Sequence, residues 1–161
     1  LGIVSLILML LVNKKNKQLL NINIKELVLI NEMSMTIGLV MLTIGNFLGG
    51  MWANESWGRY WGWDPKETWA LISIMVYAFA IHMRLIPGLK SNFAFTVASI
   101  LSFGSIIMTY FGVNFYLAGL HSYAKDDQEI SFVFIGITLV IVLLLSLLAY
   151  PKYKKYLKNN R

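Results

Sequence analysis

The residues best suited to chemistry lie in one segment, 57–69, which contains four tryptophans, a tyrosine, two acids and two bases. Large aromatic faces can bind a flat ligand by stacking. Trp and Tyr also favour the headgroup zone of a membrane, where they form an interfacial belt. Pattern alone leaves both interpretations open, a ligand platform or a belt. The aromatic residues concerned are Trp57, Tyr60, Trp61, Trp63 and Trp69.

Two histidines are the other candidates for chemistry. His121 lies in a loop, where it is either a solvated side chain or an axial ligand of a haem iron, a role that histidine commonly has. His82 lies 13 residues past Trp69, so a helix places it about 20 Å further along. An ionisable residue inside a span suggests function. The alternatives for His82 are a neutral imidazole bonded to a neighbouring span or an interface residue near Arg84.

Asp64 and Glu67 also have a structural interpretation. Asp64 can serve as the N-cap of a helix, Pro65 suits the first helical position, and Glu67 stands three residues after the cap. The spacing therefore predicts a capping box. A ligand contact or a proton-transfer role for the two acids stays open beside it, because one side chain can serve both purposes.

The elements that must position these residues are membrane-spanning helices. The 161 residues are 57% hydrophobic and only 14% charged, with a mean hydropathy of +0.63, a balance typical of membrane proteins. We predict an all-α, polytopic integral membrane bundle forming one transmembrane domain over 1–161. It has four full spans and one truncated span, at about 1–12 (partial), 33–52, 68–86, 92–111 and 130–150. Loops at 53–67 and 112–129 join them on one side.

Charge predicts the orientation of this bundle. Eleven of the 14 bases fall on one side, which we assign to the cytoplasm, and three fall with the aromatic segment: Arg59, Lys66 and Lys125. The Trp-rich and His121 loops are then on the outer face, and the C-terminus is cytoplasmic. Because topology explains the bases, we expect no nucleic-acid partner. The absence of cysteine excludes a thiolate metal site and a thiol nucleophile.

Small residues recur along two of the predicted spans. We interpret both series as surfaces for close helix packing. The first series is Ser34, Gly38, Gly45 and Gly49, and the second is Ala98, Ser102, Ser105 and Thr109.

The segment 57–69 resembles the tryptophan-rich WWD signature of the haem-handling proteins of cytochrome c maturation. Asp64-Pro-Lys-Glu-Thr-Trp69, and later Tyr110-Phe-Gly-Val-Asn114 and Gly119-Leu-His-Ser-Tyr123, are similar to the CcsA (ResC) branch of that superfamily. The resemblance covers about residues 45–123, with its motifs in the same order along the chain.

This resemblance implies a protein of cytochrome c biogenesis system II in a bacterial inner membrane, or in the thylakoid for plastid relatives. With a CcsB (ResB)-like partner, such proteins carry haem b outward and attach it to the CxxCH cysteines of apocytochrome c. The resemblance implies haem contacts for Trp57, Tyr60, Trp61, Trp63, Asp64 and Trp69, and iron ligation by His121 and His82 at separate sites. It predicts part of a cytochrome c synthetase, without assigning a catalytic side chain here.

The family pattern also has an outer histidine before the Trp-rich segment and a second intramembrane histidine. Neither occurs here, and the chain begins at Leu1 inside an apolar run. We therefore expect a C-terminal fragment, with the missing ligands upstream or on the partner. Two alternatives remain: delivery of haem to a haem chaperone without ligation, and a proton or ion transporter using His82, Asp64 and Glu67.

Overall fold

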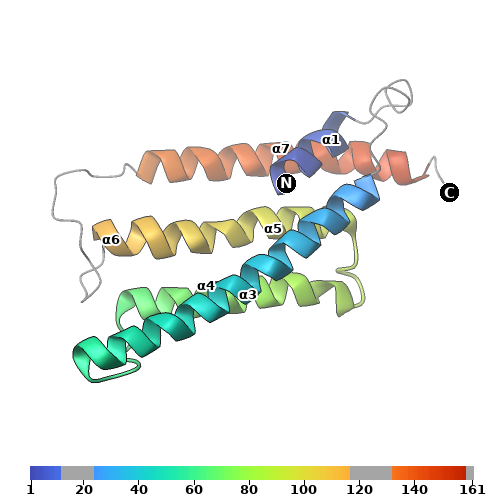
Figure 1. The fold of residues 1–161 in the computed structure, drawn as a ribbon. Coiled ribbons are helices and arrows are strands. Elements are labelled where there is room, and N and C mark those ends of the chain that lie inside the picture. Colours follow the sequence, from blue (N-terminus) through green and yellow to red (C-terminus); the bar gives the residue numbers. More distant parts are fainter. Residues whose placement is uncertain (12–23, 117–131, 159–161) are drawn as a thin grey trace.

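A computed structural model describes residues 1–11, 24–116 and 132–158, and the regular elements in these ranges are helices (Figure 1). Four of the described helices are long and apolar enough to cross a membrane. They are α3 (Ile24–Trp57), α4 (Pro65–His82) with the short 3-10 helix η1 (Met83–Leu85), α5 (Asn92–Ile107) with the π-helical turn η2 (Met108–Gly112), and α7 (Phe132–Lys158). Helices α1 (Gly2–Leu11) and α6 (Val113–Tyr116) are shorter. The predicted all-helical membrane fold is confirmed.

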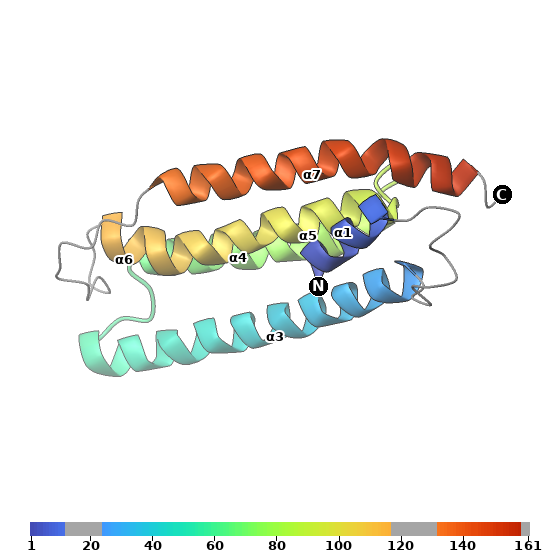
Figure 2. The same ribbon diagram turned by 90° about the horizontal axis from the view of Figure 1, so that it is seen from above.

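The helices form an elongated bundle around α4 and α5. Helix α4 packs against α3 and α5, while α1 packs among α3, α5 and α7. Figure 2 shows α3 along one side of the bundle and α7 along the other. The α3–α4 connection and α6 lie at the same end, and η1 and the last turns of α7 lie at the opposite end.

Most apolar side chains of the spans point away from the bundle. Between 17% and 22% of the residues in each hydrophobic window are buried inside the structure, as expected for helices whose remaining surface faces lipid. The main buried cluster lies toward the η1 end, where Met9, Val28, Met83, Phe95 and Tyr153 meet. The end that carries the Trp-rich connection therefore depends less on apolar packing.

The predicted loop at 53–67 is shorter in the structure, because residues 53–57 are helical and α4 already begins at Pro65. Helix α3 ends where Gly58 adopts a φ of 70°, a conformation that glycine adopts without steric cost. Its 34 residues span about 51 Å, more than the hydrocarbon core of a bilayer requires. Trp52 and Trp57 therefore belong to the last turns of a long helix.

The helix that carries the last predicted span does not end at Pro151, since α7 continues through this proline to Lys158. Proline removes one backbone hydrogen bond from a helix and often ends it. Here the Phe93 ring of α5 contacts Tyr150 and Tyr153, with ring centroids 5.4 Å and 6.3 Å away. These contacts hold the helix on both sides of Pro151.

Among the described residues, no helix occupies the packing surface predicted on α3. A Cβ atom added to Gly38, Gly45 or Gly49 would meet no atom within 4 Å, so no neighbouring helix in the described part of the chain packs closely there. The second series behaves as predicted. Ser102 is buried, and the Thr109 hydroxyl lies 2.9 Å from that of Ser73 on α4.

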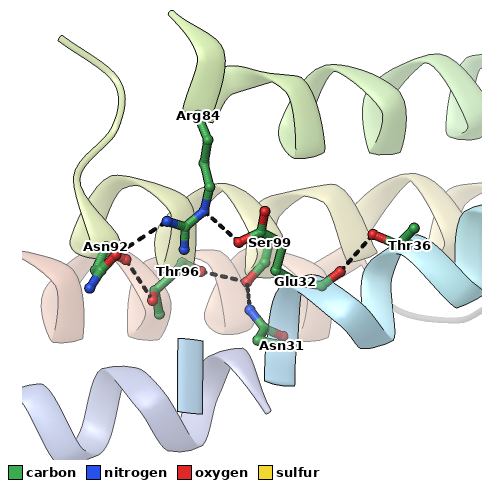
Figure 3. Close-up of polar contacts among 7 residues, drawn as sticks. All are labelled: Asn31, Glu32, Thr36, Arg84, Asn92, Thr96 and Ser99. Atoms are coloured by element: carbon green, nitrogen blue, oxygen red, sulfur yellow. Dashed lines mark hydrogen bonds and ion pairs between the residues drawn. The ribbon is translucent and has the colours of Figure 1, made fainter. Parts of the chain in front are cut away.

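A polar cluster joins three elements near the η1 end (Figure 3). Arg84 of η1 forms an ion pair with Glu32 of α3, with Nε and Oε2 2.7 Å apart. The Arg84 guanidinium also lies 4.5 Å from the centre of the Phe95 ring of α5. Asn31 of α3 donates to the Ser99 hydroxyl of α5 at 2.9 Å. Because apolar packing against α3 is sparse, these directional contacts fix its register.

We predict that Arg84→Gln and Glu32→Gln each lower the free energy of unfolding by about 1 kcal/mol, because the two side chains are about one quarter exposed. The double variant should lose less than the sum of the single losses, since neither charge is then left alone. Thermal unfolding of the full-length protein in detergent measures the three values. Strictly additive losses would show that the pair contributes no coupling energy.

Candidate functional site

The candidate site is the connection between α3 and α4. Helix α3 ends with the Gly58 N–H donating to the Asn54 carbonyl at 2.9 Å, and Gly58 then turns the chain. Residues 59–63 lead into Asp64, which has an extended backbone (φ −59°, ψ 145°) and caps α4. The connection is therefore fixed at both ends by helix termini that the sequence itself encodes.

The predicted capping box at the start of α4 is confirmed. Asp64 is buried, and its Oδ1 accepts from the Lys66 N–H at 3.1 Å. Glu67 Oε2 accepts from the Asp64 N–H at 3.3 Å, and also from the Gly62 N–H at 2.7 Å. The second of these bonds lies outside the capping box. Through this bond Glu67 also fixes the backbone of the aromatic connection at Gly62.

Trp63 has the most unusual backbone conformation of the described residues. Its φ of 57° is the sole positive value among the described non-glycine residues, and such a conformation costs of order 1–3 kcal/mol for a bulky side chain. Glu67 holds the N–H groups of the two flanking residues, Gly62 and Asp64. The result is an indole that is 71% exposed. Strain maintained in this way is typical of binding and catalytic sites.

The aromatic residues of the connection form two edge-on pairs. Trp52 and Trp57 have ring centroids 5.1 Å apart, and Trp61 and Trp63 have centroids 5.8 Å apart. Trp63, Trp52 and Tyr60 are exposed, whereas Trp57 and Trp61 are half-buried and support them. The arrangement presents large aromatic surfaces at the end of the bundle, which can stack on a flat ligand.

Polar contacts connect this site to the segment that follows α5. Lys66 Nζ donates to Asn114 Oδ1 of α6 at 3.0 Å. One turn further along α4, the Thr109 hydroxyl lies 3.1 Å from the Trp69 carbonyl oxygen. The sequence analysis placed Lys66 and Asn114 in two separate motifs but did not predict that they pair. The pairing joins residues 48 positions apart, and spacing predicts such contacts only for neighbours in a helix or turn.

His82 is the last residue of α4, at the opposite end from the Trp-rich connection. Its side chain is exposed, and Nδ1 lies 2.7 Å from the Ala78 carbonyl oxygen of its own helix. The bond to a neighbouring span, one of the alternatives for His82, is therefore not the contact observed. A carbonyl only accepts, so Nδ1 carries the proton, and Nε2 of the neutral ring has the lone pair. Metal-binding histidines commonly have this arrangement.

A family model described as cytochrome c assembly protein matches residues 1–121. The chain belongs to the cytochrome c assembly protein family. Its similarity to individual relatives is also high. It is 53% identical over 137 residues to protein NrfI of Wolinella succinogenes, covering 85% of this chain and 15% of NrfI.

Two further relatives carry the name cytochrome c biogenesis protein CcsA. The identity to CcsA of Cuscuta reflexa is 49% over 102 residues, covering 63% of this chain and 33% of the relative. For CcsA of Cyanophora paradoxa it is 51% over 88 residues, covering 55% and 27%. The chain thus spans between about one seventh and one third of the length of these relatives. The predicted resemblance to the CcsA branch is confirmed.

In this cytochrome c assembly protein, the predicted site residues fall into separate groups. Trp57, Tyr60, Trp61, Trp63 and Asp64 lie together in the α3–α4 connection, with Trp69 in the second turn of α4. His82 lies at the other end of the bundle. His121 lies outside the described residues. Among those that the structure describes, no group of three or more His, Cys, Asp or Glu side chains gathers as a metal cluster would.

The strain at Trp63 leads to a prediction about stability. Trp63→Gly should be more stable than Trp63→Ala by about 1 kcal/mol, because glycine adopts a positive φ without the steric cost that any Cβ brings. Both variants remove the indole, so each controls for loss of the ring in the other. Thermal unfolding of the full-length protein measures the difference. Equal stability would show that the left-handed conformation at position 63 is not strained.

Proposed function

We propose that the Trp-rich connection binds haem b as a substrate and holds it for attachment to apocytochrome c. Family membership supports a role in cytochrome c assembly, in which haem is the group handled. The observation that carries the proposal is the exposed Trp63 indole, which Glu67 maintains in a strained conformation beside other aromatic rings.

The aromatic rings suit a porphyrin in shape and chemistry. Stacking on a flat π-system contributes about 0.5–1.5 kcal/mol per ring beyond the area buried. Trp57, Tyr60, Trp61 and Trp63 would contact the porphyrin face. Asp64 would contribute to haem binding indirectly, because it caps α4 and so fixes the connection. Trp69 would contribute through the contact of its carbonyl oxygen with Thr109.

The two histidines would bind iron at different places. His121 would be one axial ligand at the Trp-rich site. His82 would serve a second, intramembrane site through Nε2, because its Nδ1 already donates to the Ala78 carbonyl. In each case a second axial ligand would come from outside this chain's described residues, such as the rest of a longer protein or a CcsB-like partner.

The chain's contribution to the reaction would be positioning. Haem supplies its own reactive groups, the vinyls, to which the CxxCH thiols of apocytochrome c add. The aromatic rings would hold the macrocycle, and the helix cap would hold the rings, so that the reacting groups meet in a fixed orientation. No side chain of this chain is assigned a proton-transfer step.

The charge distribution supports a membrane orientation for this role. Described bases gather at the η1 end, in Lys25, Arg84, Lys90 and the last turns of α7, whereas Arg59 and Lys66 lie at the other. Bases favour the cytoplasmic side. The Trp-rich connection would therefore face outward, toward the compartment where apocytochrome c receives haem, and the C-terminus would be cytoplasmic.

A transporter role has less support from the geometry. It would need Asp64 and Glu67 as proton carriers, but both carboxylates accept backbone N–H bonds at the start of α4. His82 lies at the other end of the helix, about 20 Å beyond Trp69. The three groups form no continuous path among the described residues.

The proposal predicts that Trp63→Ala and His121→Ala lower the haem content of the purified full-length protein. The loss of one stacked ring should weaken binding roughly two- to tenfold, and loss of His121 should also shift the Soret band, because the iron then lacks a ligand. Absorption spectra measure both effects. A co-expressed cytochrome c reporter, stained for covalent haem, measures attachment.

Phe103→Ala is the matched control, because Phe103 is also an exposed aromatic residue but lies in α5, outside the Trp-rich connection. It should leave haem content and the Soret band unchanged. If both site variants also retain full haem content and the normal Soret band, the Trp-rich connection does not bind haem.

A further inference from the structure

Arg59 occupies a defined position inside the Trp-rich connection. It is half-buried, and its guanidinium lies directly against Gly62. A Cβ atom added to Gly62 would fall on Nη1 and Cζ of Arg59, so the guanidinium occupies the space that a side chain at position 62 would take. The connection therefore carries a cation in the same short segment as the exposed residues Tyr60 and Trp63.

No described residue neutralises the charge of Arg59. Within the described ranges, Arg59 has no ion pair, hydrogen bond or ring contact. The nearest acid in sequence, Glu55, is exposed on the last turns of α3 and forms no ion pair with Arg59. The next two, Asp64 and Glu67, accept backbone N–H bonds at the start of α4. A half-buried guanidinium has lost part of its hydration, which favours an anion from outside.

Arg84 provides a contrast within the same chain. Its guanidinium pairs with Glu32 at 2.7 Å, lies over the Phe95 ring, and has Asn92 Oδ1 3.4 Å from Nη1. The fold therefore surrounds one described arginine with partners, whereas it positions the other, Arg59, at the aromatic site without them. A ligand-binding role for Arg59 would explain why it lacks such partners in the described ranges.

We propose that Arg59 binds a carboxylate at the edge of the Trp-rich connection, and that this carboxylate is a propionate of haem. The inference rests on the proposed function, because it names a contact within the same site. A guanidinium binds a carboxylate through two parallel N–H bonds, which adds direction as well as affinity. Stacking alone leaves a flat macrocycle free to rotate in its plane, and a cation at one edge removes that freedom.

The consequence concerns the orientation of the substrate. The propionates and the vinyl groups of haem b lie toward opposite edges of the macrocycle. A propionate bound at Arg59 therefore turns the vinyl edge away from the α3–α4 connection, toward the incoming thiols. Arg59 would therefore determine which edge of haem the site presents to the thiols.

The test compares haem with haem dimethyl ester, in which both propionate charges are removed. The full-length protein in nanodiscs of zwitterionic lipid is titrated with each compound and followed by Soret absorbance. Wild-type protein should bind haem about three- to tenfold more tightly than the ester, as expected for a partly exposed charge pair. Arg59→Gln should bind both compounds equally, with its affinity for the ester unchanged.

Two further variants complete the design. Arg59→Lys keeps the charge but loses the bidentate geometry, so its preference for haem should be intermediate. Lys154→Gln makes the same change of net charge on the last turns of α7, at the other end of the bundle. It should keep the wild-type preference, which shows that the effect is local to Arg59.

The outcomes separate the two proposals. If wild-type protein binds haem and the ester equally, or if Arg59→Gln retains the preference, Arg59 does not bind a propionate. The proposal that the Trp-rich connection binds haem is then unaffected. Haem affinity is also measured after phosphatidylglycerol is added. If Arg59→Gln retains the preference for haem, and phosphatidylglycerol changes the haem affinity of wild-type protein but not that of Arg59→Gln, Arg59 binds lipid phosphate and the inference is overturned. If neither compound binds wild-type protein, the haem site itself is wrong.

Discussion

The structure of the candidate site depends on the two hydrogen bonds that Glu67 accepts from the N–H groups of Gly62 and Asp64. One of these bonds completes the cap of α4. The other reaches back across Trp63 and stabilises a backbone conformation that a bulky residue otherwise avoids. A single carboxylate thus both starts a helix and sets the exposure of an aromatic ring. The stability of the helix terminus offsets the strain at Trp63.

Helix α4 carries this site and connects it to the rest of the bundle through polar contacts. At its first turn Lys66 donates to Asn114, and further along Ser73 meets Thr109 across the interface with η2. Just beyond its end, Arg84 joins α3 and α5. In a membrane the lipid is as apolar as the side chains, so apolar burial drives helix association weakly. Directional contacts of this kind determine register instead.

The two described arginines show how the same side chain serves different ends of one helix. Arg84 is surrounded by Glu32 and Phe95, and it contributes to the packing of three elements. Arg59 lies against Gly62 with its charge directed at no partner in the described ranges. This second cation stands in the Trp-rich connection, beside the strained Trp63 in the chain.

Local rules in the sequence determined much of this protein. Composition and length predict the spanning helices, the Asp64-Pro65-Lys66-Glu67 spacing predicts the capping box, and the Trp-rich and Asn114 motifs predict the family. These features depend on residues close together along the chain. The continuation of α7 through Pro151 depends instead on Phe93, which lies far away in sequence, and the open space beside Gly38 depends on which face α3 presents. Likewise, only tertiary structure decided that Lys66 meets Asn114, and that Arg84 is paired while Arg59 has no partner in the described part of the chain. Contacts between distant residues follow from how helices pack, and periodicity within one helix does not contain that information.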